Sequence, residues 1–264
     1  MLPYHHYLLP LRKIKHMIYR ELPKAEYEYL ESAILYEDNH LLVVNKAVGD
    51  IIQGDKTGDE PLNERYKAFI AARDSKPGAV FMGVAHRLDR PVSGVCIFAK
   101  TSKSLSRLNE MFRDGHNIDK YYYALVSAMP SVPEATIENY LIRNEKQNKS
   151  YVWKGSGRTS QSQNTQSQIP KDAKLAKLNY KFLEATKTYF LLEVKLLTGR
   201  HHQIRCQLAD MGCVIKGDLK YGAKRSNPNG GICLHAQRIC FIHPVKKLEI
   251  TIEAPLPSDW KLTI

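Results

Sequence analysis

The stretch AHRLDRPVSGVCIFAK (residues 85–100) passes from a cluster of charged residues directly into an apolar run. The run predicts a buried strand, and the proline before it biases the preceding residue toward an extended conformation. Asp89 is therefore expected in a loop that leads into the strand, a position that often carries function. The arginines around it would hold its carboxylate ionised, and an ionised carboxylate can act as a nucleophile. The stretch alone also fits a salt-bridged loop aspartate without a catalytic role, which is the more common case.

The composition is that of a globular and strongly basic protein. The chain has 264 residues, of which 43% are hydrophobic, enough for one large domain or two small ones with a sizeable core. It carries 39 Lys and Arg against 27 Asp and Glu, a formal net charge of +12. A protein with this balance commonly binds polyanions, and nucleic acid above all, although a basic surface also serves solubility.

The cysteines and the N-terminal stretch predict a cytoplasmic protein. Five cysteines are an odd number, and charged residues come too early and too often for a secretory signal, so a disulfide framework is not expected. No apolar run approaches the roughly 20 residues that a membrane helix needs. We therefore expect an intracellular, soluble protein that has no membrane partner.

Most of the chain shows the pattern of short strands separated by turns. Strands are predicted within ILYEDNHLLVVNKAVGDIIQ, DKYYYALVS, LNYKFLEA, KTYFLLEVKLL, ICLHAQRICF and KKLEITIEAP, and helices over residues 60–75, within TSKSLSRLNEMFRDG and within HHQIRCQLADMG. The fold class that follows is α+β, a largely antiparallel mixed sheet with flanking helices. The polar stretch at 155–168 is expected to be an exposed loop inserted into one continuous domain.

Two of these elements have predicted ends or faces. In the second helix, Ser102 is a plausible N-cap and Gly115 a plausible C-terminal stop. In the strand DKYYYALVS, the two-residue period places Tyr122 on the face opposite to Tyr121 and Tyr123. A tyrosine in a site could stack on a nucleic-acid base, whereas ordinary packing is the usual role of strand tyrosines.

A second charged cluster lies in TGRHHQIRCQL (residues 198–208), which holds Arg200, His202, Gln203 and Arg205 within two turns of chain. Arginines near the start of a helix can bind phosphate. The alternative is a solvated basic face of the helix. The residues of this stretch leave both possibilities open.

Taken in this order, the three stretches resemble the RluA-type family of RNA pseudouridine synthases. That family carries an HRLDxxTSG motif with the catalytic aspartate, then K-x-Y-x-A, then TGRxHQIR, here HRLDRPVSG, KYYYA and TGRHHQIR. The stretches ILYEDNHLLVVNKAVG, GDLKYG and LHAQRICFIHP are similar to further segments of the family, so the resemblance covers about residues 33–255. Ala47 stands where the family usually has proline, and Val92 where it has threonine.

The resemblance implies an isomerisation without cofactor or metal. The N1–C1′ bond of a uridine is broken, the uracil turns, and it is rejoined through C5. Asp89 would attack the ribose C1′ or promote an elimination at the sugar, and the sequence does not separate these routes. Tyr122 would stack on the flipped base and help remove the C5 proton. Arg205 would pair with Asp89 and hold it ionised.

The resemblance also implies a set of residues near the RNA and a base pocket. Arg87 and Arg90 would lie near RNA phosphates, and Ile204 would form a wall of the base pocket. Arg200, His202 and Gln203 complete the expected RNA-binding set together with His86, for which ordinary packing is as good an expectation. The implied substrate is structured RNA, ribosomal or transfer RNA, handled by a monomer with no obligate protein partner.

The family often carries an S4-type RNA-binding domain before the catalytic domain. Only about 32 residues precede the first strand of the resemblance, and the expected organisation is a short N-terminal arm over 1–32 followed by a catalytic domain over 33–264. We therefore expect a member that acts without an S4 domain.

Four other readings compete with this one. A zinc site could use Cys233, His235, Cys240 and His243, but the usual C-x2–4-C spacing is missing. A non-catalytic RNA-binding protein or chaperone on the same fold is the main alternative. A glycoside hydrolase would need a second carboxylate beside Asp89. A protein kinase would need an Asn after an HRD motif, a DFG motif and a Gly-rich loop.

Overall fold

The computed structural model describes residues 19–54, 57–155 and 169–260. The strands are β1 (Ile34–Glu37), β2 (Leu41–Lys46), β3 (Gly83–Val84), β4 (Ser93–Ala99), β5 (Ile118–Val126), β6 (Glu134–Asn144), β7 (Lys149–Val152), β8 (Lys174–Ala185), β9 (Phe190–Leu196), β10 (Leu234–Ile242) and β11 (Glu249–Glu253). The α-helices are α1 (Lys24–Ser32), α2 (Leu62–Arg73), α3 (Ser102–Asp114) and α4 (Gln203–Asp210), with 3-10 turns η2 (Leu219–Tyr221) and η3 (Ser258–Trp260).

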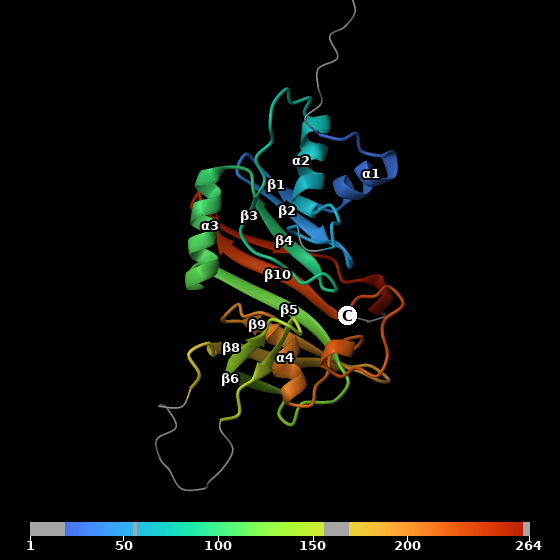
Figure 1. Cartoon of the computed structure of the whole chain (residues 1–264), viewed down its shortest axis with the longest axis vertical. Helices are drawn as coiled ribbons and strands as arrows, with labels where there is room; N and C mark the ends of the chain where they lie inside the picture. The colour runs from blue at the N-terminus through green and yellow to red at the C-terminus, as the bar shows by residue number, and fades with distance from the viewer. Residues whose placement is uncertain (1–18, 55–56, 156–168, 261–264) are drawn as a thin grey trace, which may run out of the picture.

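The strands form one sheet in the order β1-β2-β4-β10-β5-β9-β8-β6-β7, with β3 also paired to β4 and β11 to β10. Within the described residues, every strand pair is antiparallel except β4 with β10. Helices α1 and α2 lie beside the upper part of this sheet, α3 at its left edge and α4 against its lower part (Figure 1). The predicted α+β class with a largely antiparallel mixed sheet is confirmed.

Strand β10 joins the two halves of the sheet. It runs parallel to β4, where Ala236 pairs with Gly94, and antiparallel to β5, where Ala236 pairs with Tyr122. Gly94 has a φ of 112°, and a Cβ there would lie 2.3 Å from the carbonyl oxygen of Ala236. Only glycine permits this close approach. The loop that carries Asp89 is thereby held one strand away from Tyr122.

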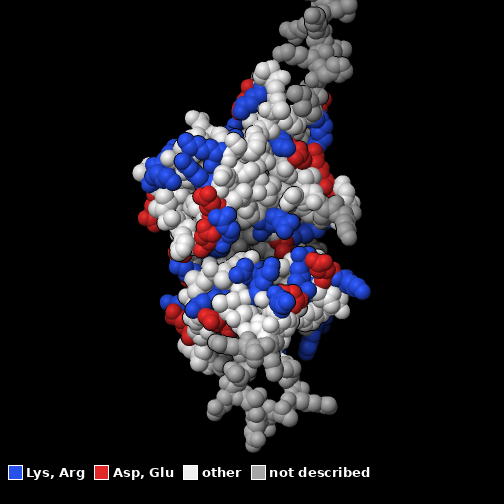
Figure 2. Space-filling model, turned by 60° about the vertical axis from the view of Figure 1, so that its left-hand side comes forward, with Lys and Arg blue, Asp and Glu red and all other residues white. Residues whose placement is uncertain are grey.

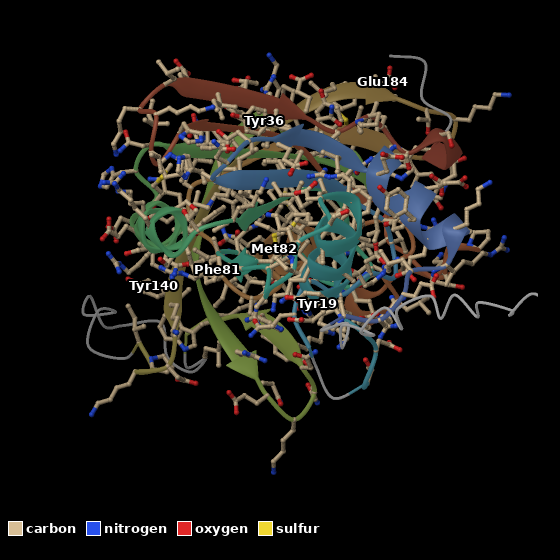
Figure 3. All side chains as sticks on the ribbon, turned by 90° about the horizontal axis from the view of Figure 1, so that it is seen from above. Tyr19, Tyr36, Phe81, Met82, Tyr140 and Glu184 are labelled. Atoms are coloured by element: carbon tan, nitrogen blue, oxygen red, sulfur yellow. The ribbon has the colours of Figure 1, made fainter. Side chains whose placement is uncertain are left out.

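The sheet is covered on both faces at β4. All seven residues of β4 are buried, and its side chains alternate between two apolar clusters. Cys96 and Phe98 pack with α1, α2 and α4, whereas Ile97 packs with Leu108 of α3. Seen from above in Figure 3, Tyr19 and Met82 lie on one side of the sheet and Tyr36 on the other. This double coverage explains why the apolar run of β4 is continuous rather than alternating.

Helix α3 confirms one predicted end and corrects the other. Gly115 closes the helix in the left-handed conformation, with φ 71°. The N-cap, however, is Thr101 and not Ser102, because the Thr101 side chain accepts a hydrogen bond from the backbone N–H of Ser104. Both residues are good caps, so composition alone could not choose between neighbours.

The described part of the N-terminal arm packs on the rest of the chain. Leu30 of α1 is fully buried, and its carbonyl oxygen accepts a hydrogen bond from Tyr66 of α2 at 3.0 Å. Residues 1–18 and most of the polar loop, 156–168, lie outside the described residues, so the division into arm and catalytic domain stays a prediction. Among the described helices none is long and apolar enough to span a membrane.

Candidate active site

The loop before β4 and helix α4 meet at a cavity of about 380 Å³. Here Arg205 Nη1 donates a hydrogen bond to Asp89 Oδ2 at 2.9 Å. The Asp89 side chain is 32% exposed, whereas that of Arg205 is only 6% exposed. The Asp89 carboxylate therefore faces the cavity, whereas the guanidinium of Arg205 is buried. The predicted pairing of Asp89 with Arg205 is present in the structure.

Arg205 is itself held from the other side by Asp218, which precedes the turn η2. Arg205 Nε and Nη2 donate to the two carboxylate oxygens of Asp218 at 2.7 and 2.8 Å. Asp218 is 1% exposed. Burial would lower the pKa of Arg205, but the hydrogen bonds to Asp218 and the charge of Asp89 raise it. One guanidinium thus joins a buried carboxylate to the exposed one, in the bidentate geometry that orients arginine best.

A histidine also touches Asp89. His202 Nε2 lies 3.3 Å from Asp89 Oδ2, and its Nδ1 lies 3.1 Å from the hydroxyl of Tyr221. Burial lowers the pKa of His202 to about 3, so the ring is neutral near pH 7. A neutral imidazole adds no positive charge beside Asp89. Among the described residues, Arg205 is therefore the charged partner of Asp89.

The third predicted catalytic residue, Tyr122, projects from β5 into the same cavity. The cavity wall beside it is apolar, with Leu196, Ile204 and Leu234. Burial and the charge of Asp89 raise the pKa of Tyr122, so its hydroxyl stays protonated. The cavity thus combines a flat aromatic ring, an apolar wall and an ionisable oxygen, which suits a flipped base with its ribose.

Most of the predicted RNA-binding residues line this cavity: His86, Arg87, Arg200, His202, Gln203 and Ile204. Figure 2 shows a hollow across the middle of the molecule with Lys and Arg atoms on both of its sides. Arg90 is not in the cavity wall, and its guanidinium pairs with Asp59 at 2.5 Å instead. The role of each of these residues toward RNA stays a prediction.

His86 and Gln203 of that set are also engaged within the protein. His86 Nε2 accepts a hydrogen bond from the backbone N–H of Ile97 at 2.9 Å, and its ring stacks on Phe112. Gln203 accepts hydrogen bonds from Thr198 and from the backbone N–H of Arg200. These contacts shape the loop before β4 and the turn before α4.

The sequence analysis missed several residues of the site. Asp218 lies in the quoted stretch GDLKYG, but no neighbouring residue in the sequence predicts that its carboxylate is buried against an arginine. Phe112, Lys120 and Arg143 also line the cavity from three different elements. Lys120 did carry a signal, because it is the lysine of the K-x-Y-x-A motif and shares the Tyr122 face of the strand.

The side chains of the zinc alternative do not converge. Cys233 packs in a cluster with Leu125 and Trp260, while His243 pairs with Asp38. The described residues contain no group of three or more His, Cys, Asp or Glu side chains that could hold a metal ion.

Comparisons with known proteins agree with the geometry. A model of the RNA pseudouridylate synthase family matches residues 40–210. The chain is 30% identical to a ribosomal large subunit pseudouridine synthase C of Vibrio cholerae, over 87% of this chain and 67% of that one. It is 31% identical to the protein of the same name from Rickettsia prowazekii, over 94% and 76%. A ribosomal large subunit pseudouridine synthase D of Zymomonas mobilis is 29% identical, over 87% and 70%.

A solved structure is similar in fold. The human RNA pseudouridylate synthase domain containing 4 superposes with a TM-score of 0.73 at 21% identity, covering 89% of this chain and 93% of that one. The chain therefore shares its overall fold with a protein of solved structure.

Proposed function

The chain belongs to the RNA pseudouridylate synthase family, and we propose that it converts specific uridines of ribosomal RNA into pseudouridine, with Asp89 as the catalytic carboxylate. The family makes it an RNA-modifying isomerase. Ribosomal RNA is preferred over transfer RNA because relatives that cover most of the chain are named for the large ribosomal subunit. A monomer that acts in the cytoplasm is part of the same proposal.

One observation carries the assignment of Asp89. Its carboxylate is the partly exposed end of the chain of contacts that runs from Asp218 through Arg205, and it shares a cavity with Tyr122. A structural ion pair would gain nothing from facing a cavity, whereas a nucleophile must reach its substrate. The Arg205 guanidinium fixes the direction of the carboxylate and keeps it anionic.

The proposed chemistry follows from these positions. Asp89 Oδ attacks the ribose C1′ as the N1–C1′ bond breaks, and the uracil leaves as an anion held against Tyr122. The uracil turns, C5 forms the new bond to C1′ as the Asp89–C1′ bond breaks, and the C5 proton moves to N1 with help from a base. In the elimination route, Asp89 instead takes a sugar proton and returns it. Both routes use the same carboxylate and need no cofactor.

The deciding experiment is pseudouridine mapping of total RNA from cells with and without this gene. We expect one or a few ribosomal positions to lose pseudouridine in the deleted strain and to regain it when the wild-type gene, but not the Asp89→Asn gene, is returned. Unchanged maps would contradict the proposal. If the protein were a non-catalytic RNA-binding protein on this fold, the wild-type gene and the Asp89→Asn gene would correct any growth defect of the deleted strain equally well.

A further inference from the structure

Lys120 places an ammonium group at the active-site cavity, and none of the described carboxylates forms an ion pair with it. It lies on β5 two residues before Tyr122, and so its side chain leaves the same face of the strand. The residue is 9% exposed and lines the cavity. No hydrogen bond or ion pair joins its Nζ to another described residue. The Nζ atom lies over the ring of Phe112, 5.9 Å from its centroid.

The described carboxylates nearest to this cation are paired with other cations. Burial lowers the pKa of Lys120, and Asp119 is the carboxylate that opposes the shift. Asp119, however, points to the other face of the strand, where Lys195 pairs with it at 2.8 Å. Asp89 is already satisfied by Arg205. The stem of Lys120 is buried, but its Nζ is open to the cavity, so an anion that enters the cavity can take the place of water beside the ammonium.

The turn before α4 leaves this ammonium uncovered. Gly199 does not have the positive φ that would require glycine for its backbone. A Cβ at this position would lie 4.0 Å from Lys120 Nζ, in van der Waals contact with the ammonium. The absence of a side chain at Gly199 therefore keeps open the space in which an anion can reach Lys120.

We propose that Lys120 binds a backbone phosphate of the RNA next to the reacting uridine. The proposal rests on the proposed function, because it takes RNA as the occupant of the cavity. An RNA strand whose ribose sits at Asp89 must bring a neighbouring phosphate along the cavity. Lys120 supplies the cation for that phosphate, while Arg205 remains committed to the carboxylates. Lys120 thus becomes a substrate-positioning residue that the catalytic trio does not include.

The test measures binding of single-stranded oligouridylate of about 12 nucleotides, a length within the range that one binding groove spans. Wild type, Lys120→Met, Lys120→Arg and Lys103→Met are compared by fluorescence anisotropy over a series of salt concentrations. Lys103 is an exposed lysine at the start of α3 and serves as the matched control. Loss of one phosphate contact on a single strand lowers the slope of log affinity against log salt by about 0.7.

We expect Lys120→Met to lower the slope by that amount and to weaken binding about ten-fold, as the loss of one charged hydrogen bond predicts. Lys120→Arg should keep the slope, and Lys103→Met should match wild type. The melting temperature of Lys120→Met should equal or exceed that of wild type, because methionine keeps the apolar stem and no described residue loses an ionic partner. A purely structural lysine would instead lower the melting temperature and leave the salt slope unchanged.

The outcomes distinguish a failure of the phosphate assignment from a failure of the proposed enzyme function. If wild type binds the oligonucleotide and Lys120→Met keeps the full salt slope, the phosphate assignment is wrong while the enzyme assignment stands. If wild type neither binds the oligonucleotide nor forms pseudouridine in cells, both the phosphate assignment and the enzyme assignment are wrong.

Discussion

Asp89 and Arg205 lie 116 residues apart in the chain, and the Arg205 guanidinium donates to the Asp89 carboxylate at 2.9 Å. Nε and Nη2 of the same guanidinium donate hydrogen bonds to the two carboxylate oxygens of Asp218. Arg205 therefore cannot swing away without breaking a buried bidentate pair. The buried Asp218–Arg205 pair thus fixes the direction of the Asp89 carboxylate, the group proposed to be catalytic, and several expected outcomes follow.

Replacing Asp89 by Asn should abolish pseudouridine formation, by about 10³-fold or more, since the nucleophile is lost. The amide has nearly the same shape and can still accept from Arg205, so the fold should persist. RNA affinity, measured by anisotropy, should change little because the basic residues around the cavity remain. Normal turnover by this variant in a tritium-release assay would refute the assignment.

Asp218→Asn should damage both stability and activity. It leaves Arg205 buried with a neutral partner, and breaking a buried ion pair costs about 3–5 kcal/mol. A small displacement of Arg205 misdirects Asp89, for which a fall in kcat of about 10²-fold is expected. Asp210→Asn is the control, because Asp210 pairs with Lys154 on the surface and should cost less than about 1 kcal/mol. Urea unfolding and single-turnover kinetics measure the two effects, and equal behaviour of the two variants would count against the role of Asp218.

Tyr122→Phe should slow product formation far more than it weakens RNA binding. The phenyl ring keeps the stacking surface, whereas the hydroxyl, which has no hydrogen-bond partner among the described residues, is removed from the cavity. A proton-transfer role predicts a fall in kcat of about 10²-fold with little change in KM. Tyr121→Phe, on the opposite face of β5, should behave as wild type. A Tyr122→Phe enzyme with unchanged kcat would restrict Tyr122 to stacking.

Gly94→Ala should prevent stable folding. Its Cβ would lie 2.3 Å from the Ala236 carbonyl oxygen, and its φ of 112° is strained for any other residue. The expected cost is about 3 kcal/mol or more, since β4 and β10 must separate. Gly78→Ala is the matched control, because nothing lies within 4 Å of a Cβ there. Similar melting temperatures for the two variants would show that β4 and β10 tolerate separation.

Acid should destabilise the protein through His86. Its Nε2 accepts a hydrogen bond from Ile97 N–H, and burial lowers its pKa to about 3 from a usual value of 6.5. The unfolded chain therefore takes up a proton first, so the contribution of His86 is complete above about pH 6.5 and is lost progressively toward pH 3. Between pH 7 and pH 5, this group should remove about 1–2 kcal/mol of unfolding free energy.

His86→Gln keeps an acceptor for the Ile97 N–H and does not titrate. Urea unfolding at the two pH values should show a smaller loss for this variant than for wild type, by the same 1–2 kcal/mol or so. A parallel decline of both proteins would place the acid sensitivity elsewhere.

The sequence predicted best what depends on neighbours in the chain. The apolar run of β4, the glycine that ends α3 and the faces of β5 all follow from spacing and residue type, and the structure confirms them. The pairing of Asp89 with Arg205 came from the family resemblance rather than from the pattern. Asp218 and the acceptor role of His86 could not be predicted, because each is defined by a partner in another element. The cap at Thr101 was missed since two adjacent residues could serve equally well.

Strand β10 lies between β4 and β5 although it follows both by more than a hundred residues. During synthesis, the Asp89 loop and Tyr122 are both made long before the strand that brings them together. The catalytic groups cannot face one cavity until residues 234–242 have emerged and inserted. Such non-local pairing slows folding. A ribosome-bound chain that ends before β10 should therefore be unable to modify RNA, and activity should appear only after β10 has been made.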